Sequence, residues 1–103
     1  MENKILTLLG FASKAQKLSF GFASSSDAIK GKKSKIIIVS SDISEKSKKE
    51  IKFISEKYGV QVLELAETNQ TKLSAAVGRN CGIISVNDNS FASAMSEEYG
   101  RKC

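Results

Sequence analysis

The segment KIIIVS, residues 35–40, is the clearest strand in this chain of 103 residues. Its four consecutive β-branched residues show no polar alternation, which is typical of a strand covered on both faces. We therefore expect helices above and below the sheet to which this strand belongs. A chain of this length buries one modest hydrophobic core, so we expect a single domain over residues 1–103.

Helical and extended segments alternate on both sides of this strand. Apolar residues at helical spacing predict a helix from Asn3, its expected N-cap, to about Gln16. A short apolar stretch, Leu18–Phe20, predicts a strand that ends in a turn at Gly21. The further predicted elements are a helix over 22–30 with Gly31 as its C′ residue, a strand over 35–40, a helix capped within 41–44 and ended by Gly59, a strand over 60–65, a helix from Thr68-Asn69 through Val77, a strand over 81–86, and a last helix after 87–90.

This alternation of helices and strands predicts an α/β fold. Its regularity favours a three-layer α/β/α sandwich around a largely buried sheet. The chain contains no proline, so its turns must rest on glycine, asparagine, aspartate and serine.

The composition excludes several kinds of active site. The sequence has no histidine, which removes the commonest general base and metal ligand, and every Ser-His or Cys-His nucleophile pair. Its two cysteines, Cys81 and Cys103, show no C-x-x-C spacing, and we expect Cys81 to be a buried core residue. We expect no enzyme activity, no cofactor and no metal. No signal peptide and no stretch of ~20 apolar residues is present, so we expect a cytoplasmic protein without a membrane partner.

Two motifs that would indicate other chemistry are incomplete. The segment Gly31–Ser34 resembles the end of a phosphate-binding loop, but Ser26 stands where that motif needs its first glycine. Asp42 follows a buried strand, as the phospho-accepting aspartate of a receiver domain does, but no acidic pair follows the earlier strand. We interpret Asp42 as a loop or helix-capping residue.

The positive charge is concentrated in the first two fifths of the chain. Residues 3–41 contain seven lysines and one acidic residue, Asp27, whereas residues 42–103 contain nine basic and nine acidic residues. Such asymmetry is typical of a surface that binds a polyanion, although lysine-rich small proteins carry similar charge for solubility alone. Composition leaves both interpretations open.

These lysines stand on both sides of Gly21, where a helix is predicted to begin. Free N–H groups in the first turn of a helix bind anions. We expect two lysine clusters to flank one nucleic-acid groove there, with contacts to phosphates that carry no sequence information. The clusters are Lys14 and Lys17 before the helix, and Lys30, Lys32, Lys33 and Lys35 after it.

Four segments carry a family resemblance over essentially the whole chain. They are LLGFASKAQKLSFG (8–21), DAIKGKKSKIIIVSSDISEKSKKEI (27–51), TKLSAAVGR (71–79) and SVNDNSFASAM (85–95). In this order they resemble the L-seven-Ae/L-thirty-e superfamily of ribosomal proteins, and particularly its short bacterial members of the YlxQ type. The resemblance implies an α/β/α sandwich with a four-stranded mixed sheet. It also implies binding of RNA, typically of kink-turns, which are internal loops with a sharp bend.

The resemblance further implies which residues contact RNA. Gly21 stands at the glycine that opens the family's G-x-N-E-x-x-K motif, and Ala23, Ser24 and Asp27 stand at its Asn, Glu and Lys positions. Serine hydroxyls and the backbone amides after Gly21 would supply the hydrogen bonds, and the loop over 66–69 would cover a protruding nucleotide. The predicted RNA-binding residues are Lys14, Lys17, Gly21, Phe22, Ala23, Ser24, Ser25, Lys30, Lys32, Lys33, Lys35 and Thr68.

Together these observations predict a non-catalytic RNA-binding protein of ribosome or RNA metabolism. Its expected partner is structured RNA, kink-turn-like or ribosomal, with further protein partners in ribonucleoprotein complexes and no sequence-specific DNA site. The alternative is a protein-interaction module on the same fold that has lost specific RNA recognition, as the changes at 23, 24 and 27 would allow. A third interpretation is the substrate-recognising unit of an RNA-modifying complex.

Overall fold

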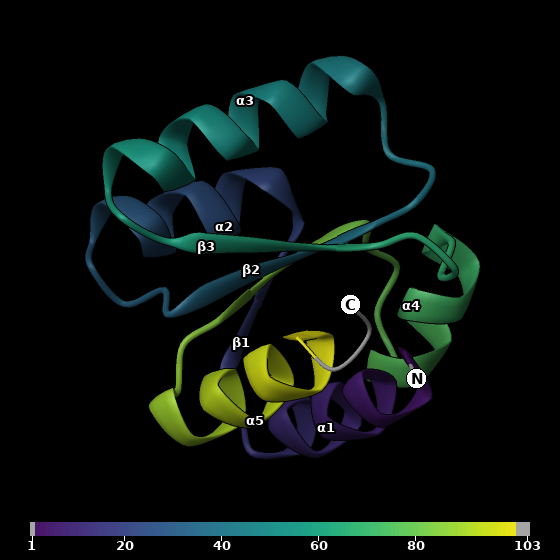
Figure 1. Cartoon of the computed structure of the whole chain (residues 1–103). Coiled ribbons are helices and arrows are strands. Elements are labelled where there is room, and N and C mark those ends of the chain that lie inside the picture. Colours follow the sequence, from purple (N-terminus) through teal and green to yellow (C-terminus); the bar gives the residue numbers. More distant parts are fainter. Residues whose placement is uncertain (1, 101–103) are drawn as a thin grey trace.

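The computed structural model describes residues 2–100 and shows the predicted three-layer α/β/α sandwich (Figure 1). The sheet has four strands: β1 (Leu18–Phe20), β2 (Ile36–Ser40), β3 (Gln61–Leu65) and β4 (Ile83–Val86), in the order β1-β4-β2-β3. β2 pairs in parallel with β3 and antiparallel with β4, and β4 also pairs antiparallel with β1. The sheet is therefore mixed, as the family resemblance implies.

Helices cover both faces of the sheet. Every residue of β2 is buried, which confirms the prediction from its β-branched run. Ile36 and Ile38 point into the core on one side of the sheet, and Ile37 and Val39 point into the core on the other. The first core lies under α1 (Glu2–Lys14), α4 (Gln70–Val77) and α5 (Asn89–Gly100), and the second under α2 (Gly21–Lys30) and α3 (Glu45–Lys57) (Figure 1).

The start of α1 differs from the expectation. The helix begins at Glu2, so Asn3 lies inside its first turn and is not the N-cap. The backbone carbonyl of Asn3 accepts a hydrogen bond from the hydroxyl of Thr7 at 3.0 Å. Such a bond, from a threonine to the carbonyl four residues before it, is common inside helices. Three strands also begin later than predicted: residues 35, 60 and 81–82 lie outside β2, β3 and β4.

The end of α2 is also different, because Gly31 does not take the left-handed conformation expected of a C′ residue. Gly31 has a φ of −81°, and Lys32, with a φ of 61°, takes that conformation instead. The N–H groups of Lys32 and Lys33 donate to the carbonyls of Ile29 and Ala28, at 3.1 and 2.9 Å. This is a Schellman arrangement with a lysine at the position where glycine is usual.

The chain connections give the sheet two chemically different ends. β1, β2 and β3 run in the same direction, and α2 is the crossover from β1 to β2 while α3 is the crossover from β2 to β3. Residues that follow these strands therefore gather at one end, called the carboxyl end below, and residues that precede them gather at the amino end. α2 and α3 both begin at the carboxyl end and finish at the amino end (Figure 1).

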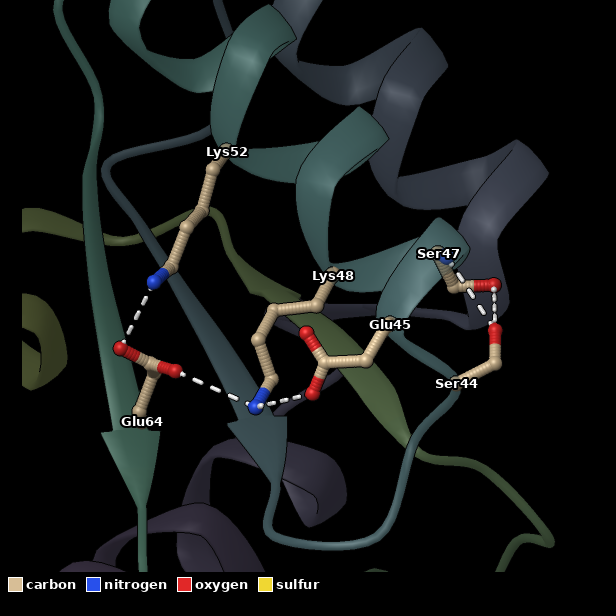
Figure 2. Close-up of polar contacts among 6 residues, drawn as sticks. All are labelled: Ser44, Glu45, Ser47, Lys48, Lys52 and Glu64. Carbon is tan, nitrogen blue, oxygen red and sulfur yellow. Dashed lines mark hydrogen bonds and ion pairs between the residues drawn. The ribbon is translucent and has the colours of Figure 1, made fainter.

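Ion pairs connect α3 to the outer strand of the sheet (Figure 2). The Nζ atom of Lys52 lies 2.9 Å from Oε2 of Glu64, and the Nζ atom of Lys48 lies 3.5 Å from its Oε1. Lys48 also lies 3.7 Å from Oε1 of Glu45. The hydrogen bond from Lys52, with the nearby positive charges, holds the pKa of Glu64 below its ordinary value. Charged side chains at an edge strand discourage pairing with a second sheet.

Candidate nucleic-acid interface

The helix α2 begins without a side-chain cap. Its first residue, Gly21, has a φ of 86°, and no side-chain hydrogen bond caps the helix at Phe20. Its first turn also contains no acidic residue. By contrast, α3 and α4 are capped by Ser44 and Asn69, whose side chains accept hydrogen bonds from backbone N–H groups (Figure 2 shows Ser44). The first turn of α2 can therefore offer its N–H groups, and the positive end of its dipole, to an anion.

An arginine that was not among the predicted site residues lies beside this helix start. The guanidinium carbon of Arg79 is 4.7 Å from the ring centroid of Phe20, which is a cation–π contact. Gly78, with a φ of 76°, ends α4 and brings Arg79 into the connection to β4. The sequence shows a glycine and an arginine at a helix end, but it does not show which strand that loop contacts. Arg79 is exposed, so its planar donors can bind phosphate.

A hollow of about 570 Å³ runs beside β1 at this place. Phe20, Ser24 and Arg79 line it, together with residues from the ends of α1 and α4. An aromatic ring, a hydroxyl group and a guanidinium group thus face one concave surface. Unpaired RNA bases are bound by this combination of stacking and hydrogen bonding.

A second hollow, of about 580 Å³, shares Arg79 with the first and lies along α4, from Gln70 at its start to the loop after it. Oδ1 of Asp42 accepts hydrogen bonds there from the N–H of Gln70 at 2.8 Å and from the hydroxyl of Ser40 at 3.0 Å. The side-chain amide of Gln70 donates to Oδ1 of Asn80 at 3.1 Å. Asp42 is therefore a capping residue, as interpreted from the sequence, although it caps α4 and not the helix that follows it in the chain.

The other residues predicted at the start of α2 differ in exposure. Ala23 and Ser24 are exposed, whereas Phe22 is partly buried against the core between α2 and α3. Ser25 is fully buried, and its hydroxyl group has no hydrogen-bond partner among the described residues. The side chain of Ser25 therefore faces the protein interior and not the candidate interface.

The predicted lysines are exposed, but they do not gather around Gly21. The carbonyl of Lys17 accepts a hydrogen bond from the N–H of Asn87, and the N–H of Lys35 donates to the carbonyl of Val86, both at 2.8 Å. Both residues thus lie at the amino end, beside the last residues of β4. We call the following group the amino-end lysines: Lys17, Lys30, Lys32, Lys33 and Lys35.

The expectation of one groove around Gly21 was wrong because α2 is a crossover helix. It carries the chain from the carboxyl end, where Gly21 lies, to the amino end, where Lys30 lies. Ten helical residues span about 15 Å. β1 separates Lys17 from Gly21 by a comparable path, about 13 Å for four extended residues. Lys14, the exposed last residue of α1, lies just before this strand.

Thr68 lies in the loop before α4, where its side chain is buried. Its hydroxyl group donates to Oε1 of Glu2 at 2.6 Å, and the N–H of Glu67 donates to both carboxylate oxygens of Glu2 at 3.1 Å. Thr68 is 2% exposed and Glu2 is 3% exposed. The pair connects α1 to this loop, so the hydroxyl group of Thr68 serves the fold and does not face a ligand.

The described residues give no indication of a metal centre. Within residues 2–100, no group of three or more histidine, cysteine or acidic side chains could hold a metal ion. Cys81 is buried as predicted, and burial raises the pKa of its thiol; Cys103 lies outside the described residues. No helix over the same range is long and apolar enough to cross a membrane.

Comparisons with known proteins identify a family and related folds. The profile described as "Ribosomal protein L7Ae/L30e/S12e/Gadd45 family" matches residues 3–96. The RNA-binding protein YlxQ of Enterococcus faecium is 32% identical over 94 residues, which cover 91% of this chain and 89% of that protein. A solved structure of a Bacillus halodurans protein with unknown function matches with a TM-score of 0.89 at 26% identity, covering 94% of this chain and 97% of that one. The Giardia lamblia 15.5kD RNA binding protein matches with a TM-score of 0.80 at 14% identity, covering 97% and 85%, a likeness of fold alone.

Proposed function

The chain belongs to the ribosomal protein L7Ae/L30e/S12e/Gadd45 family, and we propose that it is a non-catalytic protein that binds structured RNA in the cytoplasm. The relative from Enterococcus faecium is named an RNA-binding protein and matches over nearly its full length. That name favours RNA binding over a protein-interaction module that has lost RNA recognition. Ribosomal RNA is the first candidate ligand, and proteins of the same ribonucleoprotein particle are candidate neighbours.

The observation that carries the proposal is the uncapped start of α2 beside the Phe20–Arg79 pair. A phosphate at this helix start would accept hydrogen bonds from backbone N–H groups and would meet the positive end of the helix dipole. Arg79 would hold a neighbouring phosphate, and the hollow beside β1 would receive an unpaired base near Phe20 and Ser24. Such a site favours RNA that presents an extruded base next to a bent backbone.

The amino-end lysines support the proposal through their charge. Within residues 2–100, none of these lysines has an acidic partner at ion-pair distance, whereas Lys48 and Lys52 of α3 have such partners. An unpaired ammonium group is free to replace the counterions that surround a phosphate backbone, and this release drives RNA binding at low salt. The amino-end lysines therefore supply affinity, while the carboxyl end supplies the shape that distinguishes one RNA from another.

Binding of defined RNAs by the full chain tests the proposed function. The RNAs are a hairpin with a kink-turn loop, a matched hairpin in which Watson–Crick pairs replace the loop, total ribosomal RNA, and double-stranded DNA as a control. We expect gel shifts with the looped hairpin and with ribosomal RNA at 50 mM salt, with affinity that falls by at least tenfold at 200 mM salt. Absence of binding to all RNAs at 50 mM salt would overturn the proposal.

A further inference from the structure

A groove between α2 and α3 shares Lys30 with the amino-end lysines, but its other lining residues have no role in the proposed function. Its hollow of about 370 Å³ is lined by residues of both helices: Phe22, Ser26 and Lys30 of α2, and Lys49, Glu50, Phe53 and Ile54 of α3. Phe22 is the second residue of α2 and Lys30 is the last. The groove therefore extends along the whole of α2, from the carboxyl end of the sheet to the amino end.

An exposed aromatic ring stands at the rim of this groove. Phe53 is 70% exposed, whereas Phe11 is 57% exposed and Tyr58 is 40% exposed. It lies one helical turn after Lys49 and one turn before Lys57 on α3, so the three side chains share a stripe of that helix. A flat ring between two lysines is the arrangement on which unpaired bases stack while their phosphates contact cations.

The lysines of α3 fall into two sets. Lys48 and Lys52 face β3, and their ammonium groups are bound to Glu64 (Figure 2). Lys46, Lys49 and Lys57 are exposed, and within residues 2–100 none of them has an acidic partner at ion-pair distance. Lys30 of α2 faces the same groove without such a partner. The groove is lined by two lysines, Lys30 and Lys49, and by one acidic residue, Glu50. The net charge of the groove is therefore positive and suits a polyanion.

The position of the groove links the two surfaces proposed to bind RNA. At the carboxyl end the groove begins at Phe22, directly after the uncapped start of α2. At the amino end it finishes at Lys30, which is one of the amino-end lysines. An RNA strand that leaves the start of α2 would reach those lysines over about 15 Å, the length of α2. Phe53 lies along this path.

We propose that the groove between α2 and α3 binds a single-stranded RNA segment that continues from the structured element, with one base stacked on Phe53 and its phosphates between Lys30 and Lys49. The inference rests on the proposed function, because the structured element is held at the start of α2. The groove selects for single strands, since a base can reach an exposed ring only when it is unpaired.

The test measures what a single-stranded extension adds to binding. The looped hairpin is titrated with the full chain, with and without a six-nucleotide adenosine extension at either strand end. For the wild-type chain we expect the extension on one of the two ends to tighten binding about tenfold. Phe53→Ala is expected to remove that gain and to leave binding of the unextended hairpin unchanged.

A matched variant and a second readout locate the contact. Phe11→Ala deletes another exposed ring, which is 57% exposed on α1 on the opposite face of the sheet, and should leave the gain intact. Lys49→Gln is expected to lower the salt slope of the extended hairpin by about 0.7, the value for one phosphate contact of a single strand. Extensions that carry 4-thiouridine should cross-link to the peptide that contains Phe53. Circular dichroism checks that each variant is folded.

Each outcome separates this inference from the proposed function. If the hairpin binds but neither extension adds affinity, or if Phe53→Ala keeps the gain, the inference is overturned and the proposed function stands. If no RNA binds, both fail. If Phe53→Ala leaves RNA binding unchanged but abolishes a nuclease-resistant complex with a protein from the native cell, the groove serves a protein and the RNA inference is overturned.

Discussion

The two ends of the sheet differ in what they offer a nucleic acid. The carboxyl end has the uncapped start of α2 and Arg79, which lines two hollows. The amino end has a concentration of exposed ammonium groups, the amino-end lysines. In the sequence both features stand close to Gly21, but the crossover helix places them at opposite ends of the molecule.

This separation limits how the two ends can act together. The two ends of α2 are about 15 Å apart, which exceeds the Debye length of about 8 Å at physiological ionic strength, so lysines at its end do little for a phosphate bound at its start. Their charge contributes to affinity only if the RNA itself reaches the amino end. The two ends should therefore fail in different ways when they are mutated.

Charge reversal at the amino end should have the largest effect. Lys32→Glu combined with Lys33→Glu is expected to weaken binding of all RNAs on the order of 100-fold near 100 mM salt, because repulsion replaces two phosphate contacts. The ratio of affinities for looped and fully paired hairpins should stay the same. Fluorescence anisotropy with both hairpins measures this, and Lys4→Glu on α1 is the control, with an expected loss below about threefold. A changed ratio would show that the amino end also contributes to selectivity between the two hairpins, which we do not expect.

Removal of the arginine at the carboxyl end should have a smaller but selective effect. Arg79→Ala is expected to weaken binding of the looped hairpin about tenfold and to leave the paired hairpin nearly unaffected, because the cation–π contact and one planar phosphate donor are lost. Arg79→Lys should restore only part of the loss, since lysine lacks the planar fork of donors. The same titration tests this prediction, and equal weakening of both hairpins would count against shape recognition at this end.

Replacing Lys32, which has a left-handed backbone conformation, should raise stability and weaken RNA binding. Lys32→Gly is expected to raise the free energy of unfolding by about 0.5–1 kcal/mol, because glycine takes a φ of 61° without strain. RNA affinity should fall a few-fold through the lost charge. Lys33→Gly removes the same charge without that gain in stability. Urea unfolding followed by circular dichroism distinguishes the two variants, and equal stability of both would show that Lys32 is not strained.

The paired lysines of α3 should contribute least, and to stability alone. The pKa of Glu64 is lowered in the folded state, so its contribution is present above the ordinary carboxyl range and is lost as the pH falls through the folded-state value. The melting temperature of the wild type should therefore fall more between pH 7 and pH 3 than that of Glu64→Gln. The difference should be smaller than the changes above, because these side chains are partly exposed. RNA binding at pH 7 should not change.

The elements of the fold followed from local patterns in the sequence. The β-branched run at 36–39 identified the central strand, and alternation with amphipathic helices identified the three layers. Helix ends were less predictable. Asparagine is a favoured N-cap residue and glycine a favoured C′ residue, but in the structure Asn3 is not the N-cap of α1 and Gly31 is not the C′ residue of α2. A cap depends on where the neighbouring backbone turns, and residue type alone does not determine that.

The candidate site was less predictable than the fold. Gly21 marks the start of a helix in both the sequence and the structure, since its φ of 86° suits glycine. Arg79 was missed because its contact with Phe20 joins a loop to a strand that is distant in the chain. Ser25 and Thr68 were included by position along the chain, but the phase of α2 and the buried carboxylate of Glu2 turn their hydroxyl groups inward.

We expect one structured RNA to contact both ends of the sheet. Backbone amide shifts of the ¹⁵N-labelled full chain, measured as the looped hairpin is added at 100 mM salt, test it directly. We expect the largest shifts at 21–24 and 78–80 at the carboxyl end and at 30–35 at the amino end, and little change at 3–9 on α1. Shifts confined to α1 and α5, or to only one end of the sheet, would contradict this expectation.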